Sequence, residues 1–63
     1  MSRIIRVNDC LKGVRYLNSS YIIELVRRED SESGTHIHYL IGDSKPCYLV
    51  EETIEEIIKM IDG

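Results

Sequence analysis

The C-terminal part of the chain, residues 48–63, joins a short apolar stretch to the complete pattern of a capped amphipathic helix. Thr53 and Glu56 have the spacing of a capping box, in which each side chain accepts a hydrogen bond from the other residue's backbone amide. Apolar side chains then recur with helical spacing on one face, at Ile54, Ile57, Ile58 and Ile61, and Gly63 is placed to end the helix. A helix of about nine residues is not stable alone in water. We therefore expect it to pack against a sheet formed by the rest of the chain.

The rest of the chain contains short runs of β-branched and aromatic residues separated by turn-forming residues, which is typical of strands. The first two runs predict a hairpin over residues 3–17. The expected strands are Ile4–Val7, Val14–Leu17, Tyr21–Arg28, Thr35–Ile41 and Cys47–Val50. The sequence thus predicts an α+β fold, a small antiparallel four- to five-stranded sheet with one C-terminal helix packed on it, as a single domain over residues 1–63.

The chain has 63 residues, which is near the lower limit for a domain that folds alone. Domains of this size usually gain stability from disulfides, a metal or a second subunit. The two cysteines, Cys10 and Cys47, are too few for a secreted disulfide scaffold, and no signal peptide precedes them. No apolar segment approaches the roughly 20 residues that cross a membrane. We therefore expect a cytoplasmic protein with reduced thiols that forms a homodimer and has no membrane partner.

The net charge of −3 hides an uneven distribution along the chain. Residues 1–28 hold six bases and two acids (+4), whereas residues 29–63 hold nine acids and two bases (−7). One explanation is that a basic sheet and an acidic helix attract each other within the fold, and the other is that the charges form a polar binding surface. The sequence leaves both open, and it predicts that the outer face of the helix is free and negative.

The third expected strand bears more apolar surface than one helix can cover. Alternation places Ile22 and Val26 on one face of this strand and Ile23 on the other, and it divides Ile4 from Ile5 in the same way. If the helix covers the face of Ile5 and Ile23, the open face has an apolar centre rimmed by charges, as protein interfaces do. Exposed aliphatic side chains that are merely scattered would need no partner. The predicted interface residues are Ile4, Arg6, Ile22, Glu24, Val26 and Arg28.

His36 and His38 share one face of a strand and form a pair with metal-ligand spacing. A site needs three or four ligands, and Cys47 is the one plausible third, so we predict no metal site and no cofactor. A Cys–His nucleophile pair would need an orienting third group and an oxyanion site, for which no motif is present. The isolated glycines form no phosphate-binding loop. We therefore predict no catalytic residue and expect that the protein is not an enzyme.

The basic residues raise the question of two further classes of ligand, nucleic acids and nucleotides. Nucleic-acid binding is not predicted, because the chain is acidic as a whole, has no Trp or Phe, and does not interleave its tyrosines with its arginines. A nucleotide held between two subunits is an alternative, because arginine forks suit phosphate oxygens. The possible ligand-binding residues are Arg15, Arg27, Arg28 and His38.

The order of residues along the chain resembles the FlbD-like family of small bacterial flagellar-operon proteins. The matching residues are Val7-Asn8, Leu17-Asn18, Thr35 with Ile37, Gly42, Val50 with Glu52-Thr53, and Glu55-Glu56-Ile57 with Ile61. The resemblance covers nearly the whole chain and implies the same sheet-and-helix fold and a flagellar regulatory role. Two features depart from the family pattern: residues 8–13 replace its tight Asn-Gly turn, and His36 and His38 have no counterpart in it.

These observations together predict a small non-enzymatic protein-binding module that acts as a homodimer, either as an adaptor or as a stoichiometric inhibitor. Its partners would be a second copy of itself and an unidentified protein. Small acidic proteins of phages and mobile elements that act as inhibitors are similar in appearance, which is an analogy at the level of the fold. The alternatives are an FlbD-like flagellar regulatory protein and a nucleotide sponge that binds its ligand between subunits.

Overall fold

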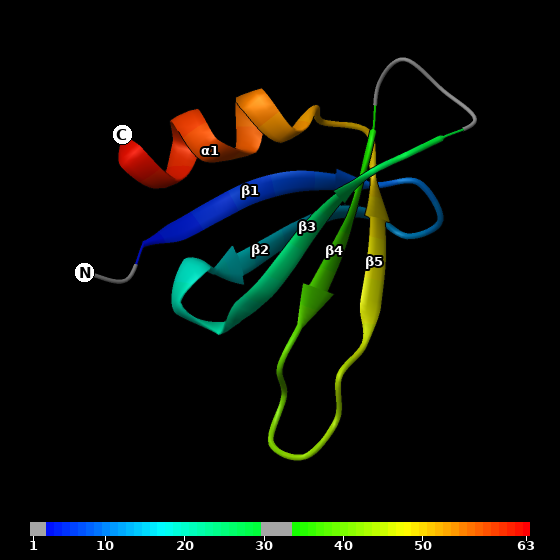
Figure 1. Cartoon of the computed structure of the whole chain (residues 1–63), viewed down its shortest axis with the longest axis vertical. Helices are drawn as coiled ribbons and strands as arrows, with labels where there is room; N and C mark the ends of the chain where they lie inside the picture. Colours follow the sequence, from blue (N-terminus) through cyan, green and yellow to red (C-terminus); the bar gives the residue numbers. More distant parts are fainter. Residues whose placement is uncertain (1–2, 30–33) are drawn as a thin grey trace.

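The computed structural model describes residues 3–29 and 34–63, in which one five-stranded antiparallel sheet is joined by one α-helix (Figure 1). In chain order the elements are β1 Ile4–Asp9, β2 Gly13–Asn18, the short 3-10 helix η1 Ser19–Tyr21, β3 Ile22–Arg27, β4 Thr35–Tyr39, β5 Cys47–Val50 and α1 Ile54–Asp62. The strands lie in the order β2-β1-β5-β4-β3 across the sheet. The predicted α+β fold is confirmed, and each strand ends within two residues of its expected bounds. The sequence also predicts a polar loop over residues 29–34, of which residues 30–33 lie outside the described residues.

The sheet turns a corner where β1 meets β5, because these two strands pair at a single position, Asp9 opposite Val50. Backbone hydrogen bonds of 2.9 Å, from Cys10 to Leu49 and from Glu51 to Asn8, hold the corner on either side. On one side β1 and β2 form a hairpin, and on the other β3, β4 and β5 form a meander (Figure 1). Side chains from the hairpin and the meander therefore face each other across the interior.

The helix α1 begins with the predicted capping box. The Thr53 hydroxyl accepts a hydrogen bond from the Glu56 amide, and the Glu56 carboxylate accepts one from the Thr53 amide, each at 3.1 Å. The helix then runs back along β1 and also contacts β3 (Figure 1). Ile57 is fully buried, whereas Ile58 is 45% exposed, so the prediction that both face the sheet is wrong for Ile58. Successive helical residues are about 100° apart, so a contact centred on Ile57 turns Ile58 toward solvent.

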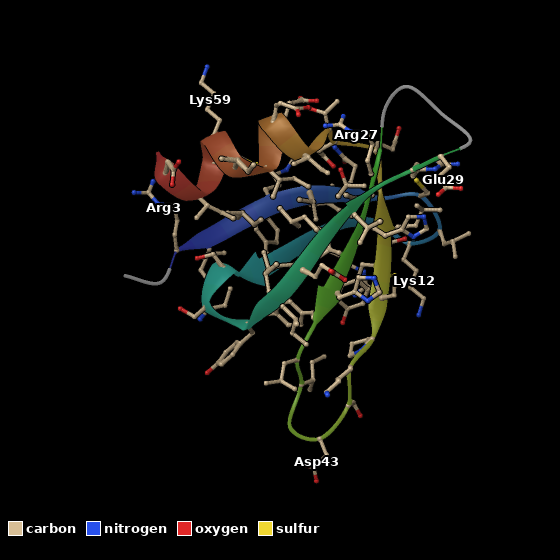
Figure 2. The ribbon with its side chains drawn as sticks, in the orientation of Figure 1. Arg3, Lys12, Arg27, Glu29, Asp43 and Lys59 are labelled. Carbon is tan, nitrogen blue, oxygen red and sulfur yellow. The ribbon has the colours of Figure 1, made fainter. Side chains whose placement is uncertain are left out.

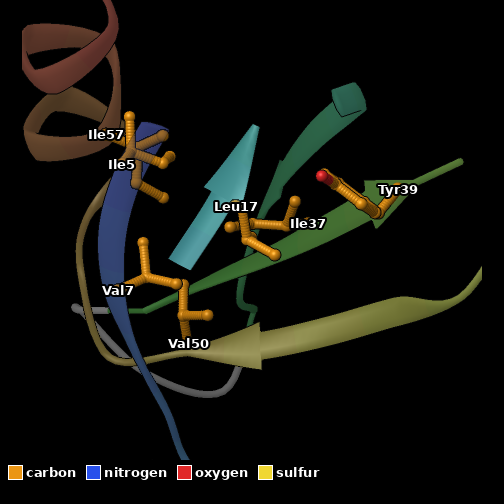
Figure 3. Close-up of a cluster of buried hydrophobic side chains, with 7 residues drawn as sticks. All are labelled: Ile5, Val7, Leu17, Ile37, Tyr39, Val50 and Ile57. Carbon is orange, nitrogen blue, oxygen red and sulfur yellow. The ribbon is translucent and has the colours of Figure 1, made fainter. Parts of the chain in front are cut away.

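The core lies between the hairpin, the meander and α1 (Figure 3). Its buried apolar side chains are Ile5, Val7, Leu17, Ile37, Tyr39, Val50 and Ile57. The Tyr39 hydroxyl accepts a hydrogen bond from the Asn18 amide at 3.0 Å, and the buried Thr35 hydroxyl donates one to the Glu52 carbonyl at 2.8 Å. These bonds satisfy the hydroxyl groups that the core encloses. A buried polar atom without a hydrogen-bond partner would destabilise the fold.

The strand β3 contains a bulge, because its pairing with β4 shifts register between Ile22 and Glu24. The extra residue lets Ile22 and Leu25 both pack against the core, although they are three positions apart, and it leaves Ile23 53% exposed. The prediction from strict alternation, that Ile22 lies on the open face and Ile23 beneath the helix, is therefore wrong.

Candidate binding surfaces

The residues predicted to form an interface lie on separate parts of the sheet. Ile4 and Arg6 are exposed on the outer face of β1, whereas Glu24 and Val26 are exposed on the outer face of β3. The strands β5 and β4 lie between β1 and β3, so these residues do not form one continuous patch. The other two predicted interface residues are the half-buried Ile22 and Arg28.

Arg15, one of the residues predicted to bind a nucleotide, is engaged within the fold. Its Nε donates a hydrogen bond to the Asp9 carboxylate at 2.6 Å, and its guanidinium carbon lies 4.4 Å from the ring centroid of Tyr48. The second Asp9 oxygen accepts hydrogen bonds from the amides of Leu11 and Lys12, at 2.8 and 3.1 Å. The hydrogen bond from Arg15, and then that from Leu11, lowers the pKa of the Asp9 carboxyl. Asp9 is therefore the ion that joins the hairpin turn to β2.

The remaining predicted nucleotide-binding residues lie elsewhere. Arg27 forms an exposed ion pair of 2.7 Å with Glu55 at the start of α1, and its hydrogen bond lowers the pKa of Glu55. This pair supports the explanation that basic strands and the acidic helix attract each other within the fold, and it shows that the outer face of the helix is not entirely free. Arg28 is half-buried, and His38 lies on the outer face of β4. Arg15, Arg27 and His38 therefore do not converge on one ligand position.

His36 and His38 lie beside Cys47 on the outer face of the sheet. The Nδ1 atom of His36 is 3.7 Å from the Cys47 Sγ, and His38 is the register partner of Cys47. Within residues 3–29 and 34–63, no three His, Cys, Asp or Glu side chains form a group that could hold a metal ion. The arrangement is a cross-strand contact between a thiol and an imidazole, and Cys47 and Cys10 are both free and exposed.

An apolar hollow of about 560 Å³ opens where β4 ends and β3 begins. We call it the tyrosine hollow, and its lining residues are Tyr21, Tyr39, Leu40, Ile41 and Gly42. The ring of Tyr21 stands edge-on to that of Tyr39, with centroids 6.2 Å apart and planes at 85°. None of the lining residues is charged. Even so, Tyr21 is 52% exposed and Ile41 is 53% exposed. The tyrosine hollow is thus an apolar surface open to solvent.

One wall of the tyrosine hollow belongs to an arm that projects between β4 and β5 (Figure 1). Backbone hydrogen bonds of 2.9 and 2.8 Å, exchanged by Ile41 and Ser44, close a two-residue turn at its tip. Gly42 opens this turn with a φ of 56°, a conformation that glycine adopts readily in hairpin turns. Asp43 points outward at the tip (Figure 2), and Lys45 is exposed two positions later. The arm is therefore an ordered ribbon that carries one charge of each sign.

A second exposed surface is the outer face of the β1–β2 hairpin. The register places Arg6 directly opposite Tyr16, with Val14 diagonal to Arg6 and Ile4 diagonal to Tyr16. Tyr16 is 68% exposed, Ile4 62% and Val14 46%. We call these four residues the hairpin face. Unlike the tyrosine hollow, the hairpin face has a base at its centre.

Sequence reasoning missed both the role of Asp9 and the tyrosine hollow. The signal for Asp9 was present, because an Asn-Asp pair before a hairpin connection is typical of a side chain that bonds the next backbone amides. The signal for the tyrosine hollow was weak. Tyr21 and Leu40 are far apart in the sequence, and the pairing of β3 with β4 brings them together, with the Leu40 amide donating to the Tyr21 carbonyl at 2.9 Å.

Comparison of the chain with protein-family models, with curated proteins and with solved structures finds no match. The resemblance to the FlbD-like family therefore stays a hypothesis from the sequence. Among the helices of the described residues, none combines the length and the apolar character needed to cross a membrane.

Proposed function

We propose that the protein is a small, non-enzymatic, cytoplasmic protein-binding module that acts as a homodimer, with the tyrosine hollow as the contact between the two copies. The single observation that carries this proposal is the exposed apolar lining of the tyrosine hollow. Such a dimer acts as an adaptor or a stoichiometric inhibitor, because it works by covering or joining the surfaces of other proteins. The FlbD-like flagellar role implied by the sequence resemblance would be one instance of this mode of action.

A twofold dimer needs a surface that complements itself, because the same residues meet on both sides of the axis. The tyrosine hollow meets this condition at its centre, where the uncharged lining lets two copies approach without repulsion. The arm that forms one of its walls adds a charge of each sign, because Asp43 and Lys45 are exposed there two positions apart. In a twofold contact, Asp43 of one copy can therefore approach Lys45 of the other.

The size of the domain gives a second reason to expect a dimer. Within the described residues seven buried apolar side chains form its core, and both cysteines are free, so no disulfide adds to its stability. A standard interface takes about 800 Å² from each partner, roughly a fifth of the 4451 Å² surface of this chain. Burial of apolar surface in such a contact offsets the entropy lost on association, and what remains stabilises the folded chain as well as the dimer.

The proposal is tested by the mass of the protein in solution, measured by sedimentation equilibrium for the wild type and two matched variants. Ile41→Asp places a charge in the tyrosine hollow, and Ile4→Asp places the same charge on the hairpin face. The two isoleucines are exposed to similar extents, 53% and 62%, so both variants should fold. We expect twice the 7.3 kDa chain mass for the wild type and Ile4→Asp, and the single-chain mass for Ile41→Asp.

Two results would overturn the proposal. A wild-type protein that stays monomeric up to millimolar concentration does not act as a homodimer. A dimer that is lost in Ile4→Asp and kept in Ile41→Asp has its contact on the hairpin face. Far-ultraviolet circular dichroism of both variants, compared with the wild type, checks that each change acts on association and not on folding.

A further inference from the structure

The hairpin face is covered by no other part of the described chain, and its composition is that of an energetic centre of binding. Aromatic residues and arginine are enriched among the residues that contribute most to protein interfaces. Tyr16 is 68% exposed, compared with 52% for Tyr21, and it stands directly across the hairpin from Arg6. Strand pairing holds the two residues side by side, so both side chains can contact one partner.

Three bases of the hairpin form no ion pair with another described residue. Arg6 forms no ion pair with another described residue, and neither do Arg3 and Lys12, which lie at opposite ends of the hairpin (Figure 2). The one acid within residues 3–18 is Asp9, which is buried and paired with Arg15. The hairpin is therefore a positive region on a chain whose net charge is −3.

Two carboxylates of the C-terminal segment border this region. Arg6 lines a hollow of about 550 Å³ together with Glu52 and Glu56. Glu52 accepts hydrogen bonds from the backbone amide and the side-chain amide of Asn8, at 2.9 and 2.8 Å, and Glu56 accepts one from the Thr53 amide. Each acid thus bonds neutral amides of the described chain and keeps its negative charge beside Arg6. The Arg6 guanidinium keeps its N–H donors for an acceptor outside it.

We infer that the hairpin face binds an acidic segment of another protein, one that carries an aromatic or branched aliphatic side chain beside its carboxylates. The inference rests on the proposed function as a protein-binding module and adds the chemistry of the partner. Arg6 holds a carboxylate through paired N–H donors, while Ile4 and the ring of Tyr16 cover the neighbouring apolar side chain. Arg3 and Lys12 attract the acidic segment from a distance and speed its association.

Two other occupants fit the hairpin face less well. A second copy bound across a twofold axis would bring two Arg6 guanidinium groups together, which repel each other. A single-stranded nucleic acid would have one ring, Tyr16, on which to stack, whereas such partners usually stack on several aromatic side chains.

The experiment is a display selection in which short random peptides are enriched on the immobilised full-length protein. We expect the enriched peptides to be more acidic than the unselected library and to contain an aromatic or branched aliphatic residue next to the acids. One enriched peptide is then synthesised and measured by calorimetry against Arg6→Glu and Tyr16→Ala. Each substitution should weaken its binding by roughly tenfold or more, because each removes a central contact.

Matched controls come from the tyrosine hollow and from the arm that forms one of its walls. Lys45→Glu reverses a charge and Tyr21→Ala truncates an exposed tyrosine, both away from the hairpin face, and neither should change the affinity per chain for the peptide. The same four variants are measured by sedimentation, where Tyr21→Ala and Lys45→Glu should weaken the dimer and the two hairpin variants should not. The inference and the proposed homodimer therefore fail independently of each other.

Three results would overturn the inference. The first is a selection that enriches nothing, or that enriches peptides without an excess of acids. The second is an acidic peptide that binds Arg6→Glu as tightly as the wild type. The third is a single-stranded oligonucleotide that binds more tightly than the peptide and is lost in Arg6→Glu. A monomeric wild type that still binds the acidic peptide through Arg6 and Tyr16 would remove the homodimer and support the inference.

Discussion

The tyrosine hollow and the hairpin face are both exposed, largely apolar surfaces of one small sheet. They differ in charge, because the first has no charged lining residue and the second contains Arg6. The tyrosine hollow has an uncharged lining, with Asp43 and Lys45 on the adjoining arm, which is why we propose a second copy as its partner. The hairpin face has Arg6 at its centre, which is why we infer an acidic partner for it and not a second copy. Exposed apolar area thus indicates where a small domain has a candidate binding surface. The charges within that area indicate which kind of partner it selects.

The two surfaces also belong to different halves of the fold. The hairpin carries one and the meander carries the other, and the two halves meet at the corner between Asp9 and Val50. A dimer built through the tyrosine hollow therefore leaves two hairpin faces free. Two linked faces bind a partner with two acidic segments more tightly than one face does, because the second contact forms within the complex.

The largest expected effect removes both surfaces at once. Ile57 is fully buried, and truncation to alanine should cost about 2–5 kcal/mol through the cavity it leaves. A domain of this size has roughly 3–5 kcal/mol in total, so Ile57→Ala should be unfolded by circular dichroism and should lose both dimer and peptide binding. The control Ile58→Ala, on the same helix but 45% exposed, should cost about 1 kcal/mol or less. A folded Ile57→Ala that lost only one activity would assign α1 to that surface.

The next effect loosens the hairpin relative to the meander. Asp9→Ala leaves Arg15 and the amides of Leu11 and Lys12 without their acceptor, which should cost about 2–3 kcal/mol. Urea denaturation measures this loss. If the variant still folds, we expect peptide binding at the hairpin face to weaken more than dimerisation, because the turn that Asp9 organises belongs to the hairpin. Equal weakening would show that the two halves of the fold act as one unit.

The same carboxylate predicts a dependence on pH. The fold lowers the pKa of Asp9, so its stabilising contribution is fully present above the unfolded value of about 3.9. That contribution is lost as the pH falls through the lower pKa of the folded state. Asp9→Asn, which cannot titrate, should lack this part of the acid-induced loss when unfolding free energies are compared across the acidic range. An identical pH profile for wild type and variant would contradict the assignment.

A smaller effect separates the two surfaces by salt. The screening length falls from about 10 Å at 0.1 M salt to about 3 Å at 1 M, which weakens contacts between exposed charges. We expect peptide binding at the hairpin face to weaken several-fold over this range in calorimetry, while the dimer measured by sedimentation changes little. A dimer that weakened as much as peptide binding would show that Asp43 and Lys45, and not the apolar lining, determine its stability.

The smallest effect concerns the fold that both surfaces share. Thr53→Ala removes the hydroxyl that caps α1 and should lower the free energy of unfolding by about 1 kcal/mol. Thermal melts measure this change, and Thr53→Ser, which keeps a capping hydroxyl, is the matched control. Both binding activities should be retained at a temperature where the variant is folded. A selective loss of peptide binding would place the start of α1 in the binding site.

The helix could be predicted in detail because its signals are local. Thr53, Glu56 and Gly63 fix its ends through contacts within a few residues, and the structure has the capping box and the end as expected. The positions of the strands follow from equally local runs of β-branched and aromatic residues, so they too could be predicted. The order of the strands across the sheet could not, because it depends on contacts between residues that are distant in the sequence.

The surfaces were predicted only in part, for the same reason. Ile4 and Arg6 were placed on an outer face and do lie on one, but alternation along β1 could not identify Tyr16 as the residue opposite Arg6. Alternation also failed on β3, because it gives a correct face only while the pairing register is continuous. A bulge interrupts the register there, and no residue type in the run from Tyr21 to Arg28 marks its position.

The bulge at Ile23 means that β3 contains one residue more than its pairing with β4 requires. If Ile23 were deleted, Ile22 would stay opposite Tyr39 and Glu24 opposite His38, and β3 would become a regular strand of the same sheet. Loss of a residue from a strand normally moves every side chain beyond it to the other face. Here it would restore strict alternation, so a chain of 62 residues is a shorter version of the same architecture that lacks one exposed aliphatic side chain.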